Sequence, residues 1–158
     1  MLLSSVENQR KSLLEATRKL RGLSRSGRYA VEYELLRSVP GVGLITAMAL
    51  LVELEDIRRF SNSDKLAGYI GLIPTSHSSG SKDSKGEMTF RGQTQLRDKL
   101  IECAWIAARV DPALAMAFNK LILRIEPNKA VTRIARKVLN RIFHVLKYRK
   151  RYEHAVVK

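Results

Sequence analysis

A proline and two glycines within four residues interrupt an otherwise helical sequence near residue 40. Upstream, residues 29–37 predict a short helix, and downstream, residues 44–52 are almost wholly apolar. Pro40 cannot continue a helix and biases the preceding residue towards an extended backbone. Gly41 and Gly43 permit positive φ and leave room for a close approach to the backbone. The sequence therefore predicts a tight turn between two helices.

The start of the second helix is a candidate anion-binding site. The first N–H groups of a helix have no partner within the helix and carry a partial positive charge. The pattern resembles the helix-hairpin-helix motif, in which the hairpin backbone holds a DNA phosphate without reading the sequence. We predict phosphate contact at Gly41, Val42 and Gly43, with a plain helix–helix turn as the alternative.

Basic side chains gather at the two ends of the chain. Lys and Arg number 29 against 15 Asp and Glu, which gives a net charge of +14 over 158 residues. Residues 1–28 carry seven basic and two acidic side chains, residues 29–118 carry ten and eleven, and residues 119–158 carry twelve and two. A near-neutral body with basic ends predicts a polyanionic partner, most simply nucleic acid, although a merely basic soluble protein is the plainer alternative.

Helical spacing recurs along the chain, and no segment shows sustained strand alternation. Residues 1–23 predict a basic amphipathic helix that would be marginal alone, so we expect it to pack on another chain or on further sequence. Asp111-Pro112 and Pro127 predict the starts of two later helices. The predicted fold is mainly α: a multi-helix domain built around a helix-hairpin-helix at residues 33–54. Residues 75–92 predict a long Ser/Gly/Lys loop, in which residues 85–91 are an alternative short hairpin arm.

The predicted last helix has one apolar face and one basic face. The apolar face is expected to be core, and the opposite face a solvated surface or a track along a nucleic-acid backbone, with Arg133, Arg136, Lys137 and Arg141. The following tail interleaves cations with aromatic residues, which predicts either contacts with phosphates and bases or a frayed basic end. We divide the chain into a helix at 1–28, a domain at 29–148 and a basic tail at 149–158.

Composition argues against a membrane protein and against a structural metal site. No apolar run approaches the length of a membrane span, and polar residues follow Met1-Leu2-Leu3 at once, unlike a signal peptide. The single cysteine, Cys103, fits a reducing compartment, so we predict a cytoplasmic protein. No Cys/His cluster has zinc-like spacing, and the carboxylates near residue 55 form only a weak pattern, so we predict no metal in this chain.

The segment at residues 75–92 carries hydroxyl groups beside a glycine. The cations near it in sequence are Lys82, Lys85, Arg91 and Arg97. A serine that attacks phosphate needs help to lose its proton and needs cations to hold the developing charge. From these residues alone, a flexible linker is the simpler interpretation.

Several short motifs occur in a characteristic order along the chain. They are residues 39–43 (VPGVG), 59–61 (RFS), 66–74 (LAGYIGLIP), 78–80 (SSG), 90–93 (FRGQ) and 96–97 (LR). Together they resemble, over roughly residues 33–148, the C-terminal domain of the transposases of bacterial insertion-sequence family one-hundred-ten. By this resemblance the nucleophile is Ser79, with Ser78 its nearest competitor, and Lys82, Arg91 and Arg97 position the strand or stabilise charge. Phe90 and Gln93 depart from the family pattern.

The resemblance also implies the remainder of such an enzyme. The family is similar to recombinases that work with a bridge RNA, and it joins an N-terminal RuvC-like domain with four acidic metal ligands to a coiled coil and this domain. We therefore expect Mg²⁺ in an N-terminal domain that this chain lacks, no cofactor in the chain itself, and partners that include DNA and a structured guide RNA. We expect a homo-oligomer through the N-terminal helix, and alone a chain that binds nucleic acid without recombining it. The alternatives are a non-catalytic helix-hairpin-helix module and a dimerisation domain.

Overall fold

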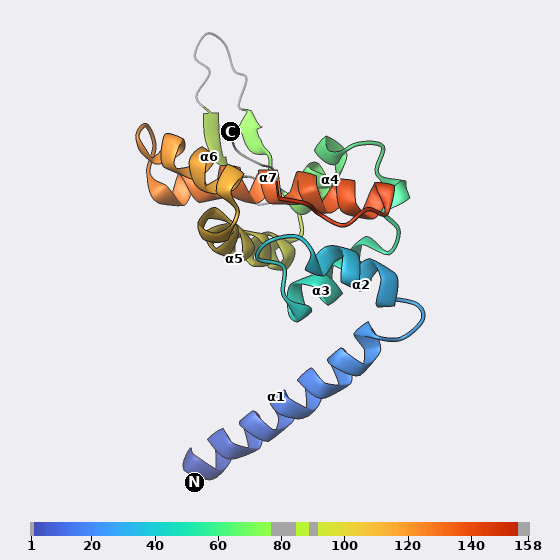
Figure 1. The fold of residues 1–158 in the computed structure, drawn as a ribbon. Coiled ribbons are helices and arrows are strands. Elements are labelled where there is room, and N and C mark those ends of the chain that lie inside the picture. The colour runs from blue at the N-terminus through green and yellow to red at the C-terminus, as the bar shows by residue number, and fades with distance from the viewer. Residues whose placement is uncertain (1, 77–84, 89–91, 155–158) are drawn as a thin grey trace.

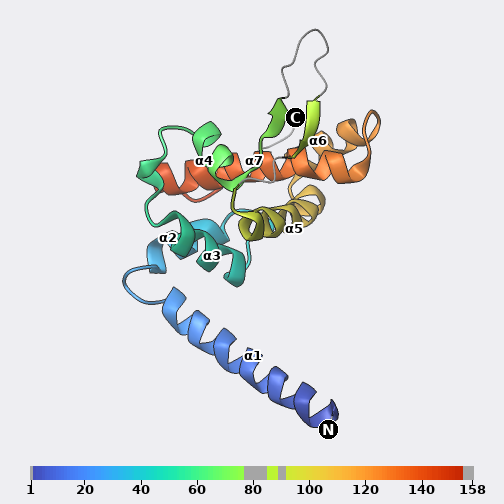
Figure 2. The same cartoon turned by 180° about the vertical axis from the view of Figure 1, so that it is seen from behind.

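The chain folds into a helical body from which one long helix projects (Figures 1 and 2). The computed structural model describes residues 2–76, 85–88 and 92–154. In order, the elements are α1 (Leu2–Ser24), α2 (Ala30–Arg37), α3 (Leu44–Leu54), the 3-10 turn η1 (Ile57–Arg59), α4 (Ser63–Ile70), β1 (Pro74–Ser76), β2 (Lys85–Met88), α5 (Thr94–Val110), α6 (Pro112–Ile122) and α7 (Pro127–Tyr148). The prediction of a mainly α fold is confirmed.

Helix α7 is the centre of the body. It contacts α2, α4, α5, α6 and η1, and apolar side chains along most of its length are buried. Ile134, Leu139 and Ile142 are fully buried against core residues such as Leu36 of α2 and Leu100 of α5. The buried residues of α7 recur at three-and-four spacing and form one apolar face, so the predicted core face is confirmed. The elements that carry the candidate site are packed around it.

Helix starts follow the local chemistry of the chain. The Asp111 carboxylate accepts a hydrogen bond from the Leu114 N–H at 2.9 Å and caps α6, whose first residue is Pro112. α7 likewise begins at Pro127, as predicted. Asn62 accepts from the Lys65 N–H at 2.9 Å and caps α4.

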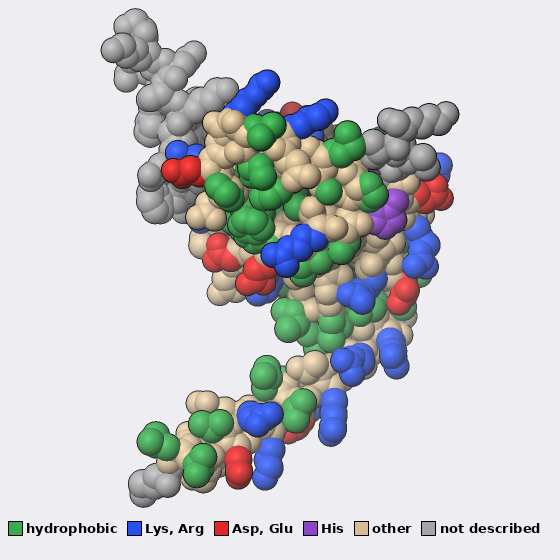
Figure 3. All heavy atoms as spheres, turned by 60° about the vertical axis from the view of Figure 1, so that its left-hand side comes forward, with side chains coloured by type: hydrophobic (Ala, Val, Ile, Leu, Met, Phe, Trp, Pro, Cys, Tyr) green, Lys and Arg blue, Asp and Glu red, His purple; other side chains and the backbone are tan. Residues whose placement is uncertain are grey.

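Helix α1 is largely solvent-exposed. Only Ser24, at its end, is buried, whereas Leu2 and Leu3 are more than four-fifths exposed. Figure 3 shows hydrophobic and basic side chains side by side along this projecting helix. The helix itself is confirmed, and its division from the body as a separate unit stays a prediction.

The segment predicted as a loop or hairpin arm contains two short antiparallel strands. β1 pairs with β2 in the register Pro74 to Met88 and Ser76 to Lys85, with an irregularity between Pro74 and Ser76. The arm was expected within residues 85–91; instead the strand at Lys85–Met88 finds its partner upstream, directly after α4. Ser78, Ser79, Lys82 and Arg91 lie outside the described residues, and for Lys85 the structure gives only the backbone.

Candidate nucleic-acid interface

Residues 38–43 join α2 to α3 in the predicted tight turn. Val39 and Val42 are buried and anchor the turn in the core. Gly41 has φ of +85°, and a Cβ built there would lie 2.3 Å from the carbonyl oxygen of Cys103 in α5. The absence of a side chain at Gly41 is therefore required by packing against α5, which the sequence did not reveal. The sequence suggested instead that Gly41 leaves room for a DNA backbone to come close to the turn.

Gly43 provides the open position in the turn. It is the N-cap of α3, with extended backbone angles of −91° and −178°, and no side chain caps the helix there. A Cβ built on Gly43 meets nothing closer than 3.9 Å, at a guanidinium nitrogen of Arg37. The first N–H groups of α3 lack partners within the helix and carry partial positive charge, so this end of the turn can hold an anion.

Arg37 is the cation of this turn, and the sequence analysis missed it. Its guanidinium Nη1 donates to the Val42 carbonyl oxygen at 2.8 Å, which fixes the exposed side chain beside the start of α3. A groove of about 430 Å³ runs along the turn and is lined by residues 37–43, Ile106, Val110 and His154. A basic residue at the end of the first helix was the only signal in the sequence, and its orientation depends on the folded turn.

The tail that follows α7 is docked on the body. We call residues 149–154 the strap. Arg149 has φ of +53°, which reverses the chain, and its guanidinium donates to Glu32 at 2.7 Å. The Tyr152 N–H donates to the Ser38 hydroxyl at 2.8 Å. The prediction of a frayed basic end is wrong for these residues, because both ends of the strap are held.

A buried hydrogen-bond cluster holds the strap. The Tyr152 hydroxyl donates to the fully buried Asp111 carboxylate and accepts from Arg141 Nε at 3.0 Å, and the Arg141 guanidinium lies 5.4 Å from the centre of the Tyr152 ring. Burial raises the pKa of Asp111, but hydrogen bonds from Tyr152 and the Leu114 N–H outweigh it, so the pKa lies below its ordinary value. Burial is also the largest cause of the raised pKa of Tyr152.

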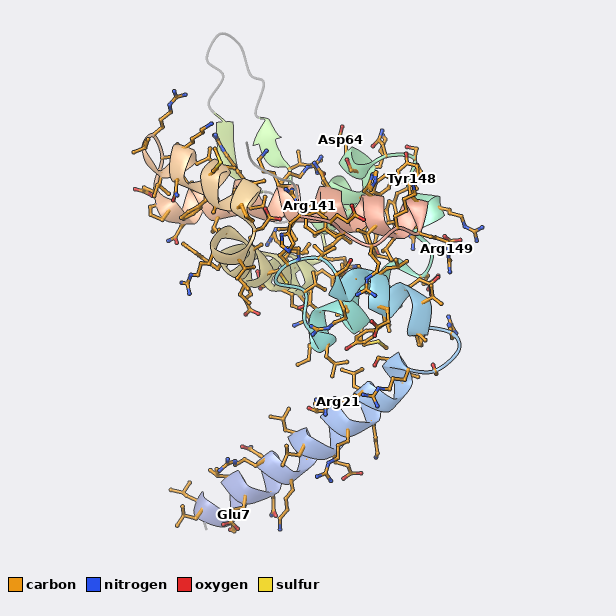
Figure 4. The ribbon with its side chains drawn as sticks, viewed as in Figure 1. Glu7, Arg21, Asp64, Arg141, Tyr148 and Arg149 are labelled. Atoms are coloured by element: carbon orange, nitrogen blue, oxygen red, sulfur yellow. The ribbon has the colours of Figure 1, made fainter. Side chains whose placement is uncertain are left out.

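The cations predicted along α7 divide into two groups. Arg136 forms an ion pair with Asp64, and Arg141 is committed to Tyr152. Asp64 and Arg141 are labelled in Figure 4. Arg133 and Lys137 are exposed and have no ion-pair partner within the described part of the chain. The basic face is thus partly a structural seam against α4 and the strap, and partly free surface. Arg97, on α5, is half-buried.

Residues 75–92, which we call the serine segment, end in a close contact with the C-terminal end of α4. A Cβ built on Gly92, which has φ of +115°, would lie 2.8 Å from the backbone N of Gly71. Gln93 Nε2 donates to the Tyr69 hydroxyl at 3.5 Å, and that hydroxyl donates to Glu53 at 2.6 Å. Its hydrogen bond to Glu53 is the largest cause of the raised pKa of Tyr69. This chain of contacts fixes the base from which the segment leaves the body.

Two kinds of feature are absent from the residues that the structure describes. Within residues 2–76, 85–88 and 92–154, no three His, Cys, Asp or Glu side chains gather as metal ligands would. In the same ranges no helix combines the length and apolar character needed to cross a membrane. Glu53, one of the carboxylates considered from the sequence, is hydrogen-bonded to Tyr69.

Comparison with known proteins identifies the family. The transposase for insertion sequence element IS1111A of Coxiella burnetii is 41% identical over 69 residues, 44% of this chain and 19% of that protein. An uncharacterized 43.6 kDa protein of insertion element IS110 from Streptomyces coelicolor is 32% identical over 114 residues, 72% of this chain and 28% of the relative. The pilin gene-inverting protein of Moraxella bovis is 31% identical over 128 residues, which are 77% of this chain and 39% of that protein.

This chain therefore spans less than half the length of these curated relatives. The sequence profile of the transposase IS116/IS110/IS902 family matches residues 33–119, from the middle of α2 to α6, and includes the turn and the serine segment. As that match covers more than half of the sequence, the chain belongs to the IS116/IS110/IS902 transposase family.

Proposed function

We propose that this chain is the nucleic-acid-binding, serine-bearing part of a transposase that cuts and rejoins DNA during insertion-sequence transposition. The observation that carries the proposal is the turn between α2 and α3, where an uncapped helix start lies beside Arg37, and the proposed role of this turn is that of a helix-hairpin-helix. Both groups suit a phosphate and neither reads a base, so binding there is independent of sequence.

The nucleophile of the proposed reaction is Ser79, with Ser78 as the alternative. Its hydroxyl oxygen loses its proton and forms a bond to phosphorus while the bond from phosphorus to a sugar oxygen breaks. The released sugar oxygen takes up a proton, so protons lost and gained are equal. Rejoining reverses the exchange, so the number of phosphodiester bonds is preserved. Family membership supports this role, as do the contacts of Gly92 and Gln93 that anchor the segment.

The complete enzyme is proposed to include parts beyond this chain. The resemblance places Mg²⁺ and its acidic ligands in an N-terminal RuvC-like domain and supplies a guide RNA. A homo-oligomer is proposed through α1, where the exposed residues Val6, Leu13 and Leu14 lie at coiled-coil spacing or beside it. A non-catalytic binding module remains the second candidate, since the turn geometry alone supports binding without chemistry.

Titration with duplex DNA tests the binding proposal. We expect affinity to fall steeply with salt, by a logarithmic slope of about 0.9 for each phosphate neutralised. Arg37→Gln should weaken binding about tenfold, whereas Arg124→Gln, at the exposed turn between α6 and α7, should change it little. No complex at low salt, or equal effects of the two variants, would overturn the proposed role of the turn.

Ser79→Ala in the complete transposase tests the chemical role. Strand exchange should be lost while DNA binding is retained, because the substitution removes only one oxygen. Ser78→Ala is the matched control and should leave exchange intact. If Ser79→Ala recombines normally and Ser78→Ala does not, the nucleophile is Ser78; if both recombine, the chain is a binding module.

A further inference from the structure

A second groove borders the strap, and it shares no lining residue with the groove along the turn. It has a volume of about 720 Å³ and runs between the C-terminal half of α7 and the strap, lined by Asn140, Arg141, His144, Lys150, Arg151 and Glu153, with Val145 and Tyr152 at its base. Three permanent cations line it against one carboxylate. Sites that bind small organic molecules have volumes of roughly 300–1,000 Å³, so a nucleotide unit can enter.

The groove exists because the strap is held in place. Arg149 reverses the chain and binds Glu32, and Tyr152 is fixed by Asp111, Arg141 and Ser38. Between these two anchors lie Lys150 and Arg151, both exposed. Neither has an ion-pair partner within the described ranges, in contrast to Arg149. The fold therefore presents two unpaired cations on an ordered segment at the rim of a concavity.

This ordering has an energetic consequence for binding. A free basic tail loses side-chain and backbone freedom when it contacts a polyanion, and that loss subtracts from the affinity. An anchored strap has already lost its backbone freedom on folding. The exposed rings of His144 and Tyr148, with centroids 4.6 Å apart, lie on the same stretch of α7 and offer a surface on which a base can stack.

We propose that this groove binds the phosphodiester backbone of a nucleic-acid strand, as a contact separate from the α2–α3 turn. The proposal rests on the proposed nucleic-acid function. Lys150 and Arg151 neutralise phosphates, and Asn140 and His144 supply hydrogen-bonding groups on the facing wall. The strap is shared by both sites, because Tyr152 borders this groove and His154 borders the groove along the turn.

The test compares two double variants with equal loss of charge. Lys150→Gln with Arg151→Gln should weaken binding to duplex DNA, or to duplex RNA of the same sequence, by tenfold or more in low salt and reduce the logarithmic salt slope by about 2. Lys120→Gln with Arg124→Gln, in α6 and in the turn that precedes α7, should change the slope by less than half as much. Equal slopes for the two pairs would overturn the proposal.

Hydrogen exchange on the whole chain locates the contact. Bound nucleic acid should slow exchange of the amides in residues 149–154 and in residues 140–145, and the DNA and RNA arms show which backbone the groove prefers. If bound nucleic acid slowed exchange only in the α2–α3 turn, the proposed binding in this groove would be overturned and the proposed function of the chain would stand. Absence of any complex with the unmodified chain would overturn both, and binding of an acidic polypeptide but not of nucleic acid would assign the groove to a protein partner instead.

Discussion

The α2–α3 turn and the strap are two basic features that the same body presents by different physical means. At the turn the positive charge comes from the partial charge of the backbone N–H groups at the start of α3 and from one arginine, Arg37. At the strap it comes from side chains that are ordered by contacts with Glu32, Ser38 and Asp111. A local sequence motif therefore encodes the turn, whereas the strap depends on residues more than forty positions away.

This difference determines how each feature should fail. The turn is part of the core, so most substitutions in it act on the stability of the whole body. The strap lies on the surface, and its release should leave α7 and the core intact. The most informative substitutions are therefore those that change nucleic-acid binding without changing the stability of the body, or the reverse.

Gly41→Val should have the largest effect. A Cβ at this position would lie 2.3 Å from the Cys103 carbonyl oxygen, and the residue would have to hold a positive φ. Backbone strain and overpacking together should lower the free energy of unfolding by about 3 kcal/mol or more. Chemical denaturation followed by circular dichroism measures it. Gly43→Ser, two residues on, is the control and should change stability by less than about 0.5 kcal/mol.

Asp111→Ala should have the next largest effect. It removes the cap of α6 and leaves the Tyr152 hydroxyl without its buried acceptor. We expect a loss of about 2 kcal/mol in the free energy of unfolding, together with faster hydrogen exchange in the strap. A loss of stability with the strap still protected would contradict the cluster as the anchor of the strap.

Tyr152→Phe should have a smaller and more local effect. The ring and its contact with Arg141 remain, but the hydroxyl bonds to Asp111 and Arg141 are lost. The equilibrium constant for local opening of the strap should rise about tenfold, which corresponds to a fall of about 1.4 kcal/mol in the free energy of opening. Amide exchange within residues 149–154 measures the opening, and exchange in the core of α7 should stay unchanged.

Acidification should release the strap with no effect near neutral pH. Because the pKa of Asp111 is depressed in the folded state, its contribution is complete above the ordinary carboxyl pKa of about 3.9 and is lost as pH falls through the lower folded value. The raised pKa of Tyr152 acts at the other extreme, and stability is lost as pH rises above about 10. The Tyr152 ring resonance should report both transitions. In Asp111→Ala the acid transition should be absent, whereas the alkaline transition should persist because the Tyr152 hydroxyl still titrates.

The sequence predicted the elements better than the contacts between them. Periodicity, Asp111-Pro112 and Pro127 located the helices of the body, because caps and apolar faces are encoded within a few residues. The close approach of Gly41 to Cys103 was not predictable, since it joins positions 62 residues apart in the sequence. The same holds for the strap, whose composition fitted a free tail equally well.

The candidate site was also only partly predictable. Gly43 was located at the helix start from the motif, whereas Arg37 was missed because its direction depends on the folded turn. Arg136 and Arg141 were predicted as binding residues from composition, and the structure commits both to intramolecular contacts. The role of Ser79 stays a prediction that rests on family membership.

The most direct test of the account places a carboxylate where the phosphate is proposed to bind. Gly43→Asp provides a favoured N-cap at an open position with extended backbone, so stability should be kept or slightly raised. Its charge should nevertheless weaken duplex DNA binding at least tenfold, whereas Gly43→Asn, a neutral cap of the same shape, should weaken it far less. Equal affinities of the Asp and Asn variants would contradict a phosphate at the start of α3.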